Sequence, residues 1–475
     1  MSEDLQAGSH TSKISEYASH SLDILPPQYT AEEIYRPDVL ETIEQALDRL
    51  SPALRDLSLK IHSHPEISFE EKYAHDTLTE FMESSGFKVT RHYLGLETAW
   101  RAEFKHGTGG RVIGVNSEMD ALPGIGHACG HNLIAIVGVA ISLGLKAVLT
   151  KHDIPGKIVL LGTPGEESGA GKAILIERGG YKDMDVCLMA HPGAGPLNCT
   201  GTGPCKATQS IFVDYRGQTA HASAAPWEGK NALDAAVIGY SSMAALRQQI
   251  EPTHRAHAII KGENWAYNII PDNAKIEACV RAPTWKEAQV LKDRVLKCFT
   301  AAADATDTTC TVTLGESLFD LKQNPLLASE YSNIIAKYGI KTIYMEGAIG
   351  GSTDFGNVTY VVPGLHPAYT IPTLPNGKNH TKAFTDAART EEAHNMSISV
   401  AKALAHTGFH VIDDDAFYSQ STGKDQTAHP QATVRTKTKF AHGFTDSVLS
   451  YLCVVIITTN GNQPSCVISR HPDQA

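Results

Sequence analysis

The chain has 475 residues, more than one hydrophobic core usually holds, so we expect two folded units with additional segments. Its 42% hydrophobic and 20% charged residues are typical of a soluble globular protein. The net charge of -11, without a long basic block, argues against nucleic acid or an anionic membrane as the main partner and favours a small-molecule substrate.

Cysteine usage and the ends of the chain indicate the compartment. Nine cysteines are scattered along the chain, an odd number without the spacing of a disulfide scaffold, which favours a reducing environment. Residues 1–30 are polar, lack the apolar core of a signal peptide and are expected to form a disordered leader. The longest apolar run, 448–457, is shorter than the ~20 residues that span a membrane. We therefore expect a cytoplasmic protein without a membrane segment.

Two helices are predicted at the start of the folded region. Apolar residues recur at helical spacing over 38–59, where Pro52 is expected to divide or kink the segment. The same spacing resumes over 70–84 and ends at Gly86, which resembles a helix C-cap.

Strands and helices then alternate. Short apolar or β-branched runs predict strands at 111–115, 157–161 and 185–189. A helix is predicted over 133–149, between the first two strands. This alternation predicts an α/β domain with a mixed sheet.

The pattern changes near residue 206 and indicates a second domain. Alternating strands at 209–215, 274–280 and 309–314 and helices at 231–249 and 285–303 follow a βαββαβ-like order, as in a ferredoxin-like α+β domain. Helices of the first domain resume at 325–337 and 387–405. We therefore predict a first domain of residues 31–205 and 317–411, an inserted domain of residues 206–316, and a poorly ordered C-terminal extension of residues 412–475.

A thiol and an imidazole lie two residues apart in the segment His127–Asn132. Gly130 lets the backbone turn so that the side chains of Cys129 and His131 can converge, and a thiolate is the metal-binding form of cysteine. Taken alone, a buried cysteine beside a hydrogen-bonded histidine is about as common as a ligand pair.

Adjacent carboxylates follow the second predicted strand. Glu166 and Glu167 lie on a glycine-rich loop, where two neighbouring side chains can diverge. One carboxylate can then bind a metal while the other holds the attacking water as a general base. The loop favours this function over two solvated helix charges.

Three further candidates lie at strand ends, where α/β sheets place their ligands. Asp120 is interpreted as a metal ligand or as a carboxylate that orients an imidazole, with a turn-capping role as the alternative. A single histidine such as His191 or His380 is more often structural. In order with the preceding motifs, both histidines are interpreted as metal ligands.

Over roughly residues 50–405 these motifs resemble the co-catalytic metallopeptidase family twenty, the aminoacylase and amidohydrolase group. Within that family they are more similar to the β-alanyl-lysine dipeptidase and aminobenzoyl-glutamate hydrolase branch than to the auxin-conjugate or hippurate branch. The resemblance rests on His64-Pro-Glu, Met119-Asp-Ala-Leu-Pro123, His127-Ala-Cys-Gly-His131, Pro164-Gly-Glu-Glu167, His191-Pro, Gly217-Gln-Thr-Ala-His-Ala222, Asn268-Ile-Ile-Pro-Asp272 and Ser352-Thr-Asp-Phe-Gly356.

The resemblance implies a two-domain metallo-amidohydrolase with two divalent metal ions. Glu166 would be the general base, and Glu118 stands where many members carry a histidine ligand. A cysteine ligand favours zinc, while imidazole and carboxylate ligands also accept manganese or cobalt. The implied metal ligands are Cys129 in the bridging place, His131, Glu167, His191 and His380.

The inserted domain would act as a lid and as the contact surface of a homodimer. His221 would reach the oxyanion, in the site of the partner subunit if the protein is dimeric, and Asn268 would bind substrate beside it. Arg281, with Gly351 and Ser352, is a candidate for holding a substrate carboxylate.

We therefore predict hydrolysis of an amide bond in an N-acyl amino acid or an unusual dipeptide. Two alternatives stay open. Cys129 could be the nucleophile of a metal-independent amidase with His131 as its base. The chain could also be a catalytically silent metal-binding homologue, although the presence of Glu166 favours an enzyme.

Overall fold

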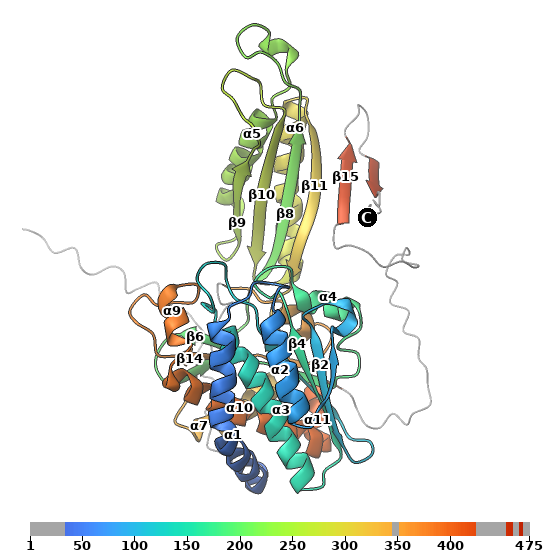
Figure 1. Cartoon of the computed structure of the whole chain (residues 1–475). Helices are drawn as coiled ribbons and strands as arrows, with labels where there is room; N and C mark the ends of the chain where they lie inside the picture. The colour runs from blue at the N-terminus through green and yellow to red at the C-terminus, as the bar shows by residue number, and fades with distance from the viewer. Residues whose placement is uncertain (1–33, 344–350, 424–452, 459–464, 469–475) are drawn as a thin grey trace, which may run out of the picture.

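The computed structural model describes residues 34–343, 351–423, 453–458 and 465–468, so the expected leader lies outside it. Two bodies are visible in Figure 1: a broad α/β domain and a narrow domain that projects from it. The chain leaves the broad domain after residue 206 and returns to it near residue 318, so the projecting domain is inserted.

A six-stranded mixed sheet forms the centre of the broad domain. β3, β4, β5 and β13 run parallel, whereas β1 and β2 are antiparallel to their neighbours. This arrangement confirms the predicted mixed sheet. In spatial order the strands are β1 (Lys88–Arg91), β2 (Trp100–His106), β4 (Gly156–Thr163), β3 (Val112–Glu118), β5 (Val186–Leu188) and β13 (Gly364–Leu365).

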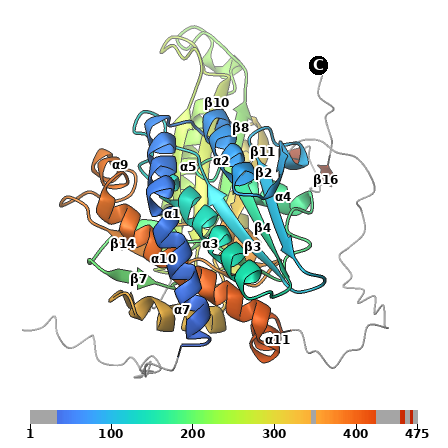
Figure 2. The ribbon, with the colours of Figure 1, turned by 60° about the horizontal axis from the view of Figure 1, so that its bottom comes forward.

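Three long helices, α1 (Pro37–Ser63), α3 (His131–Lys151) and α10 (Glu391–Asp413), contact one another against this sheet (Figure 2). α3 is apolar enough to cross a membrane by length and composition, the one such helix among the described residues. However, 83% of its most apolar window is buried inside the structure, as for the core helix of a folded domain. The remaining helices of this domain are α2 (Lys72–Ser84), α4 (Gly171–Glu177), α7 (Pro325–Ala336), α8 (Phe355–Thr359), α9 (Lys382–Ala387) and α11 (Asp415–Thr422).

Three predictions about helix boundaries were wrong. Pro52 lies inside α1 without dividing it. The helix predicted to begin at residue 387 begins at Glu391, because the hydroxyl of Thr390 accepts the Ala393 N–H and caps it. The predicted domain end at residue 411 falls inside α10, and α11 continues to pack against α7 and α10.

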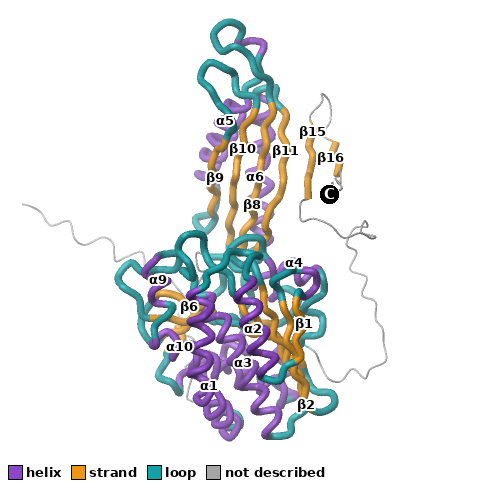
Figure 3. Tube along the Cα trace, in the orientation of Figure 1, coloured by secondary structure: helices purple, strands orange, loops and turns teal. Residues whose placement is uncertain are grey.

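The inserted domain has the predicted βαββαβ order, with both helices on one face of an antiparallel sheet (Figure 3). α6 begins with a capping box in which Thr284 and Glu287 satisfy each other's backbone N–H groups. Strand β15 (Cys453–Thr458) extends the sheet beside β11, followed by β16 (Ser465–Ile468). The domain comprises β8 (Ala207–Arg216), α5 (Ala232–Leu246), β9 (Arg255–Lys261), β10 (Asn273–Ala282), α6 (Trp285–Ala305) and β11 (Thr309–Leu318).

A small sheet beside the mixed sheet was not predicted, because its strands are short and lack an apolar alternation. It contributes a functional position, since His191 is the first residue of one strand. Its strands, in spatial order, are β12 (Lys341–Ile343), β7 (Cys199–Gly201), β14 (Ala368–Ile371) and β6 (His191–Ala194). Short 3-10 turns complete the described elements, at Tyr93–Gly95, Pro226–Glu228 and Arg247–Gln249.

Candidate metal centre

The predicted polar residues meet because three parallel strands end at one edge of the mixed sheet. Glu118 is the last residue of β3, and its register partner Thr163 ends β4 just before the Glu166–Glu167 loop. β5 runs alongside β3 and ends three residues before His191. This carboxyl edge is where α/β sheets bind their ligands.

A tight turn presents Cys129 and His131 at the start of α3. The intervening Gly130 has a φ of 83°, and a Cβ there would lie 2.6 Å from the Cγ of Pro192. Only glycine fits both the conformation and the space. The turn places the Sγ of Cys129 3.3 Å from the Nε2 of His191, so two predicted ligands from different strand ends are in contact.

Asp120 orients the ring of His131. Its Oδ1 lies 3.0 Å from His131 Nδ1, while its Oδ2 accepts hydrogen bonds from the Ser68 hydroxyl and the Glu167 N–H. Burial alone would raise the pKa of Asp120, but the charge and hydrogen bond of His131 lower it to about 2. Asp120 is therefore a charged acceptor that leaves His131 Nε2 directed at the other candidates, a common arrangement behind metal-binding histidines.

His380 approaches from the opposite side of the cluster. Its Nε2 lies 3.5 Å from Glu167 Oε1, and its backbone N–H donates to the Ala128 carbonyl. Its φ of 67° is in the left-handed region that a residue with a Cβ rarely adopts. Such backbone strain concentrates at functional sites, where surrounding contacts maintain it.

The cluster fits divalent metal ions. Three sets of donors lie within 4.8 Å of one another: Cys129 with His131 and His191, Cys129 with Glu167 and His380, and Glu118 with His131 and Glu166. Within the described residues, three buried atoms of these sets have no hydrogen-bond partner, namely His131 Nε2, Glu118 Oε2 and Glu167 Oε1. Leaving a buried polar atom unpaired costs about 1–3 kcal/mol, which metal coordination would offset.

Charge supports the same interpretation. Among the described residues, one buried lysine, Lys172, faces several carboxylates at this edge of the sheet. Two divalent cations would neutralise the excess negative charge. Thiolate, imidazole and carboxylate donors are together compatible with zinc, manganese or cobalt. The carboxylates are Glu118, Asp120, Glu166, Glu167 and Asp354.

Glu166 is suited to accept a proton. Its side chain is 9% exposed, with an oxygen 3.9 Å from His131 Nε2. Burial raises the pKa of Glu166, and the nearby charges of Glu118 and Asp354 raise it further. The loop is fixed by Glu71, a buried carboxylate that accepts the Gly165 N–H at 2.9 Å.

The environment of Cys129 disfavours a free thiolate. Burial raises the pKa of its thiol to about 12, so the nucleophilic form is scarce at neutral pH. A bound metal would deprotonate the same thiol outright. The geometry therefore favours a ligand over the nucleophile of a metal-independent amidase.

Arg281 and Ser352 are brought together where the inserted domain joins the broad domain. The guanidinium donates to Ser352 Oγ at 3.2 Å, and within the described part of the chain it pairs with no carboxylate. Ser352 also lies 2.5 Å from the Thr208 hydroxyl, and the Gly351 carbonyl accepts the Lys206 N–H. The three predicted residues Arg281, Gly351 and Ser352 thus share one location.

His221 and Asn268 lie at the opposite end of the inserted domain. The Asn268 carbonyl accepts the Ala222 N–H, so the two predicted residues are neighbours. Both follow the end of the sheet at which Arg216 pairs with Asn273, whereas Arg281 is near the other end. Ten residues of strand span about 30 Å, so His221 is far from the metal ligands of its own chain.

Two residues of the site were missed by the sequence interpretation. Lys172 lies in the first turn of α4 and joins Glu118 to Asp354 through ion pairs of 2.6 and 2.5 Å. Asp354 is part of the recognised Ser352–Gly356 motif, which was a signal for it. A lone lysine beyond a glycine-rich loop gave no signal, because its partners are 54 and 182 residues away in the chain.

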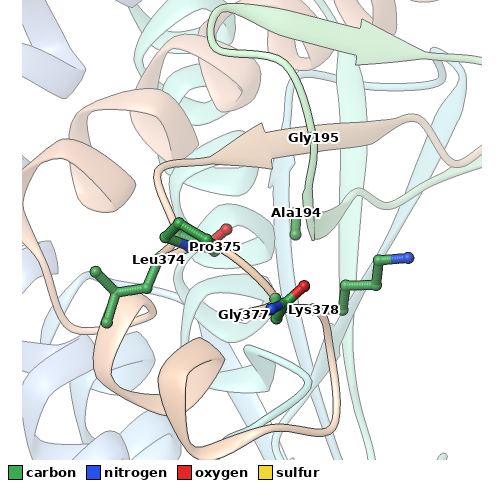
Figure 4. A pocket seen from close by; sticks show the side chains of 8 residues that line it. Ala194, Gly195, Leu374, Pro375, Gly377 and Lys378 are labelled. Carbon is green, nitrogen blue, oxygen red and sulfur yellow. The ribbon is translucent and has the colours of Figure 1, made fainter.

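A surface hollow lies beside this centre (Figure 4). Its walls are Ala194 and Gly195 after β6 and residues 373–378 of the loop that leads to His380. None of the candidate metal ligands lines it. The hollow therefore adjoins the ligand loops without containing the reacting groups.

Known proteins resemble the chain in sequence and in fold. The family described as "Peptidase family M20/M25/M40" matches residues 114–404. The Xaa-Arg dipeptidase of Mus musculus is 42% identical over 80% of this chain and 89% of its own length. One of the polypeptides of the p-aminobenzoyl-glutamate hydrolase of Escherichia coli K12 is 30% identical, over 65% of this chain and 66% of its own length.

A solved structure shares the fold at low sequence identity. The Bacillus subtilis YXEP protein, described as a dinuclear metal-binding peptidase, is 19% identical, with a TM-score of 0.61. The match covers 77% of this chain and 99% of the other.

Proposed function

The chain belongs to the peptidase family M20/M25/M40, and on this premise we propose that it hydrolyses dipeptides with a free C-terminal carboxylate, using two metal ions and Glu166. It is a hydrolase of carbon–nitrogen bonds, and the amide bonds of dipeptides or N-acyl amino acids are the class that its relatives cleave. The observation that carries the proposal is the set of convergent, unpartnered donor atoms beside Glu166.

The donor groups define which residues would hold the metals. Two divalent cations, when bound, supply Lewis acidity that lowers the pKa of water and stabilises negative charge on the scissile carbonyl oxygen. We propose zinc or manganese, with cobalt as a further possibility, because one donor is a thiol and the others are imidazoles and carboxylates. The proposed ligands are Cys129, His131, Glu167, His191 and His380.

The remaining residues of the chain handle the proton and the substrate. Glu166 accepts a proton from the attacking water and delivers it to the leaving nitrogen, because its raised pKa allows it to be reprotonated near neutral pH. Asp120 keeps His131 in the orientation that frees Nε2. Arg281 and Ser352 hold the substrate carboxylate. We further propose that this reaction takes place in the cytoplasm, from the scattered free cysteines.

The carboxylate subsite gives a substrate test. Xaa-Arg dipeptides, chosen from the Mus musculus relative, are expected to be cleaved with a higher kcat/KM than the same peptides with an amidated C-terminus. Arg281→Ala should lower kcat/KM for the free acid by about 10- to 100-fold, since a charged hydrogen bond is worth roughly 1.5–3 kcal/mol. The same variant should leave the slower cleavage of the amide almost unchanged.

Steady-state kinetics of both enzymes on both peptides completes this thermodynamic cycle, with p-aminobenzoyl-glutamate and N-acetyl-arginine as comparison substrates. An equal loss on acid and amide would show that Arg281 does not meet the carboxylate. If the metal-loaded chain cleaved no member of the panel, the proposed substrate class would be wrong.

We also propose a homodimer in which His221 acts in the partner's site. The far end of the inserted domain exposes apolar side chains around His221, of which Trp227 is 77% and Tyr267 100% exposed. Exposed patches of this kind mark interaction surfaces. A second copy could bring His221 of the partner subunit to the metal centre, which His221 cannot reach within its own chain.

Mixing two inactive variants tests this arrangement. His221→Ala and Glu166→Gln are each expected to have low activity, but mixed dimers should regain it, since one site then has Glu166 and an intact histidine from the partner. Activity is measured after co-expression with two different tags and purification of the mixed species. Mixed dimers as inactive as the parents would contradict action across the dimer.

A further inference from the structure

Lys172 forms a buried ion cluster directly behind the metal centre. Its side chain is 0% exposed, and its Nζ lies 2.6 Å from Glu118 Oε1 and 2.5 Å from Asp354 Oδ1. Both carboxylates are also 0% exposed. A buried ion pair is weak evidence for stability, because desolvation cancels much of the attraction, so its presence calls for another explanation.

The backbone fixes where the lysine lies. The Lys172 N–H donates to Asp354 Oδ2 at 2.9 Å, so both oxygens of Asp354 are engaged by the same residue. The preceding Gly171 lies so close to the Pro164 carbonyl that a Cβ would be 1.8 Å from its oxygen. The start of α4 therefore cannot move away from the Glu166–Glu167 loop without losing these contacts.

The two oxygens of Glu118 have different surroundings. Oε1 is held by Lys172, whereas Oε2 has no hydrogen-bond partner within the described residues. Oε2 lies 3.5 Å from His131 Nε2, which is equally unpartnered. Since Asp120 already occupies Nδ1 of that ring, both free atoms are directed toward one location among the proposed ligands.

We propose that Glu118 is an additional metal ligand that binds through Oε2, and that Lys172 is the positioning residue that commits Oε1 and prevents the carboxylate from rotating. The inference rests on the proposed two-metal function and adds one carboxylate to its ligand set. Asp354 holds Lys172 and, having no free oxygen, does not itself face the metals. Supporting groups of this kind typically change metal affinity by about 10- to 100-fold.

The matched pair Glu118→Gln and Asp354→Asn separates ligation from charge. Each variant removes one negative charge from Lys172 without changing side-chain shape. Zinc and manganese titrations against a competing chromophoric chelator are expected to show that Glu118→Gln weakens one of the two sites by at least about 10-fold, whereas Asp354→Asn stays within about 3-fold of wild type. Thermal unfolding of the metal-free proteins controls for folding.

A second variant tests the role of the lysine. Lys172→Met combined with Asp354→Asn removes one charge of each sign, which favours folding, but leaves Glu118 unheld. Its affinity for the same site should fall by about 10-fold, with the midpoint of unfolding near that of Asp354→Asn.

The outcomes are distinguishable. Wild-type affinity in Glu118→Gln, or equal losses in Glu118→Gln and Asp354→Asn, would overturn the inference and leave a structural charge cluster. Wild-type protein that binds fewer than two metals would instead overturn the proposed function, whatever the variants do.

Discussion

Glu166→Gln is expected to lower kcat by about 10²- to 10⁴-fold while both metals stay bound, because a general base contributes a factor of this size. The substitution keeps the shape of the side chain and removes its ability to accept a proton. Glu166 contacts the cluster only through a 3.9 Å approach to His131 Nε2, so its loss should spare the principal ligands.

The adjacent residue provides the matched control. Glu167→Gln alters a carboxylate on the same loop whose oxygen lies 3.5 Å from His380 Nε2 and 3.8 Å from His131 Nε2. This variant should lose bound metal, and added metal should restore part of its activity. Metal counting by plasma mass spectrometry beside steady-state kinetics distinguishes the two. Full turnover in Glu166→Gln would show that another group is the base.

Cys129→Ala is expected to weaken metal binding by about 100-fold or more and to regain partial activity in excess metal. Its sulfur belongs to two of the three donor sets, so removing it affects both proposed metals. If Cys129 were the nucleophile, the variant would instead retain its metals and lose activity at every metal concentration.

Cys205→Ala is the control for this comparison, because Cys205 is another free, partly buried cysteine and belongs to none of the donor sets. It should match wild type in metal affinity, measured by chelator competition, and in kcat. An equal loss of affinity in Cys205→Ala would mean that general damage to the region, rather than a missing ligand, explains the effect.

The main features of the broad domain could be predicted because they depend on local pattern. Apolar runs followed by polar residues at 118, 163 and 189 mark the ends of β3, β4 and β5 to within a few residues. Parallel strands bring such ends to one edge of a sheet. The turn at Gly130 was predictable for the same reason, since a glycine between two potential ligands indicates a tight backbone bend.

Features that depend on distant contacts could not be predicted. Pro52 was expected to interrupt α1, but the helix persists, buried along one side against α3 and α10. The short strands of the sheet containing β6 have no periodicity of their own and form through pairing with β14, almost 180 residues away. Tertiary contacts therefore determined these elements more than local propensity did.

The candidate site shows the same division. The motifs around Cys129 and Glu167 identify potential ligands, but only the fold reveals that Glu118 has one oxygen held by Lys172 and one oxygen free. The sequence also gave no measure of the distance between His221 and the metal ligands. That separation follows from ten-residue strands whose two ends carry the two groups of substrate-binding candidates.

The central claim is that this chain hydrolyses its substrate only with metals bound beside Glu166. The most direct test is turnover of an Xaa-Arg dipeptide by protein stripped with a chelator and dialysed, before and after zinc or manganese is added and counted. We predict no turnover above background without metal, and recovery as two ions bind per chain. Activity that survives complete metal removal but is abolished by thiol alkylation would contradict the claim.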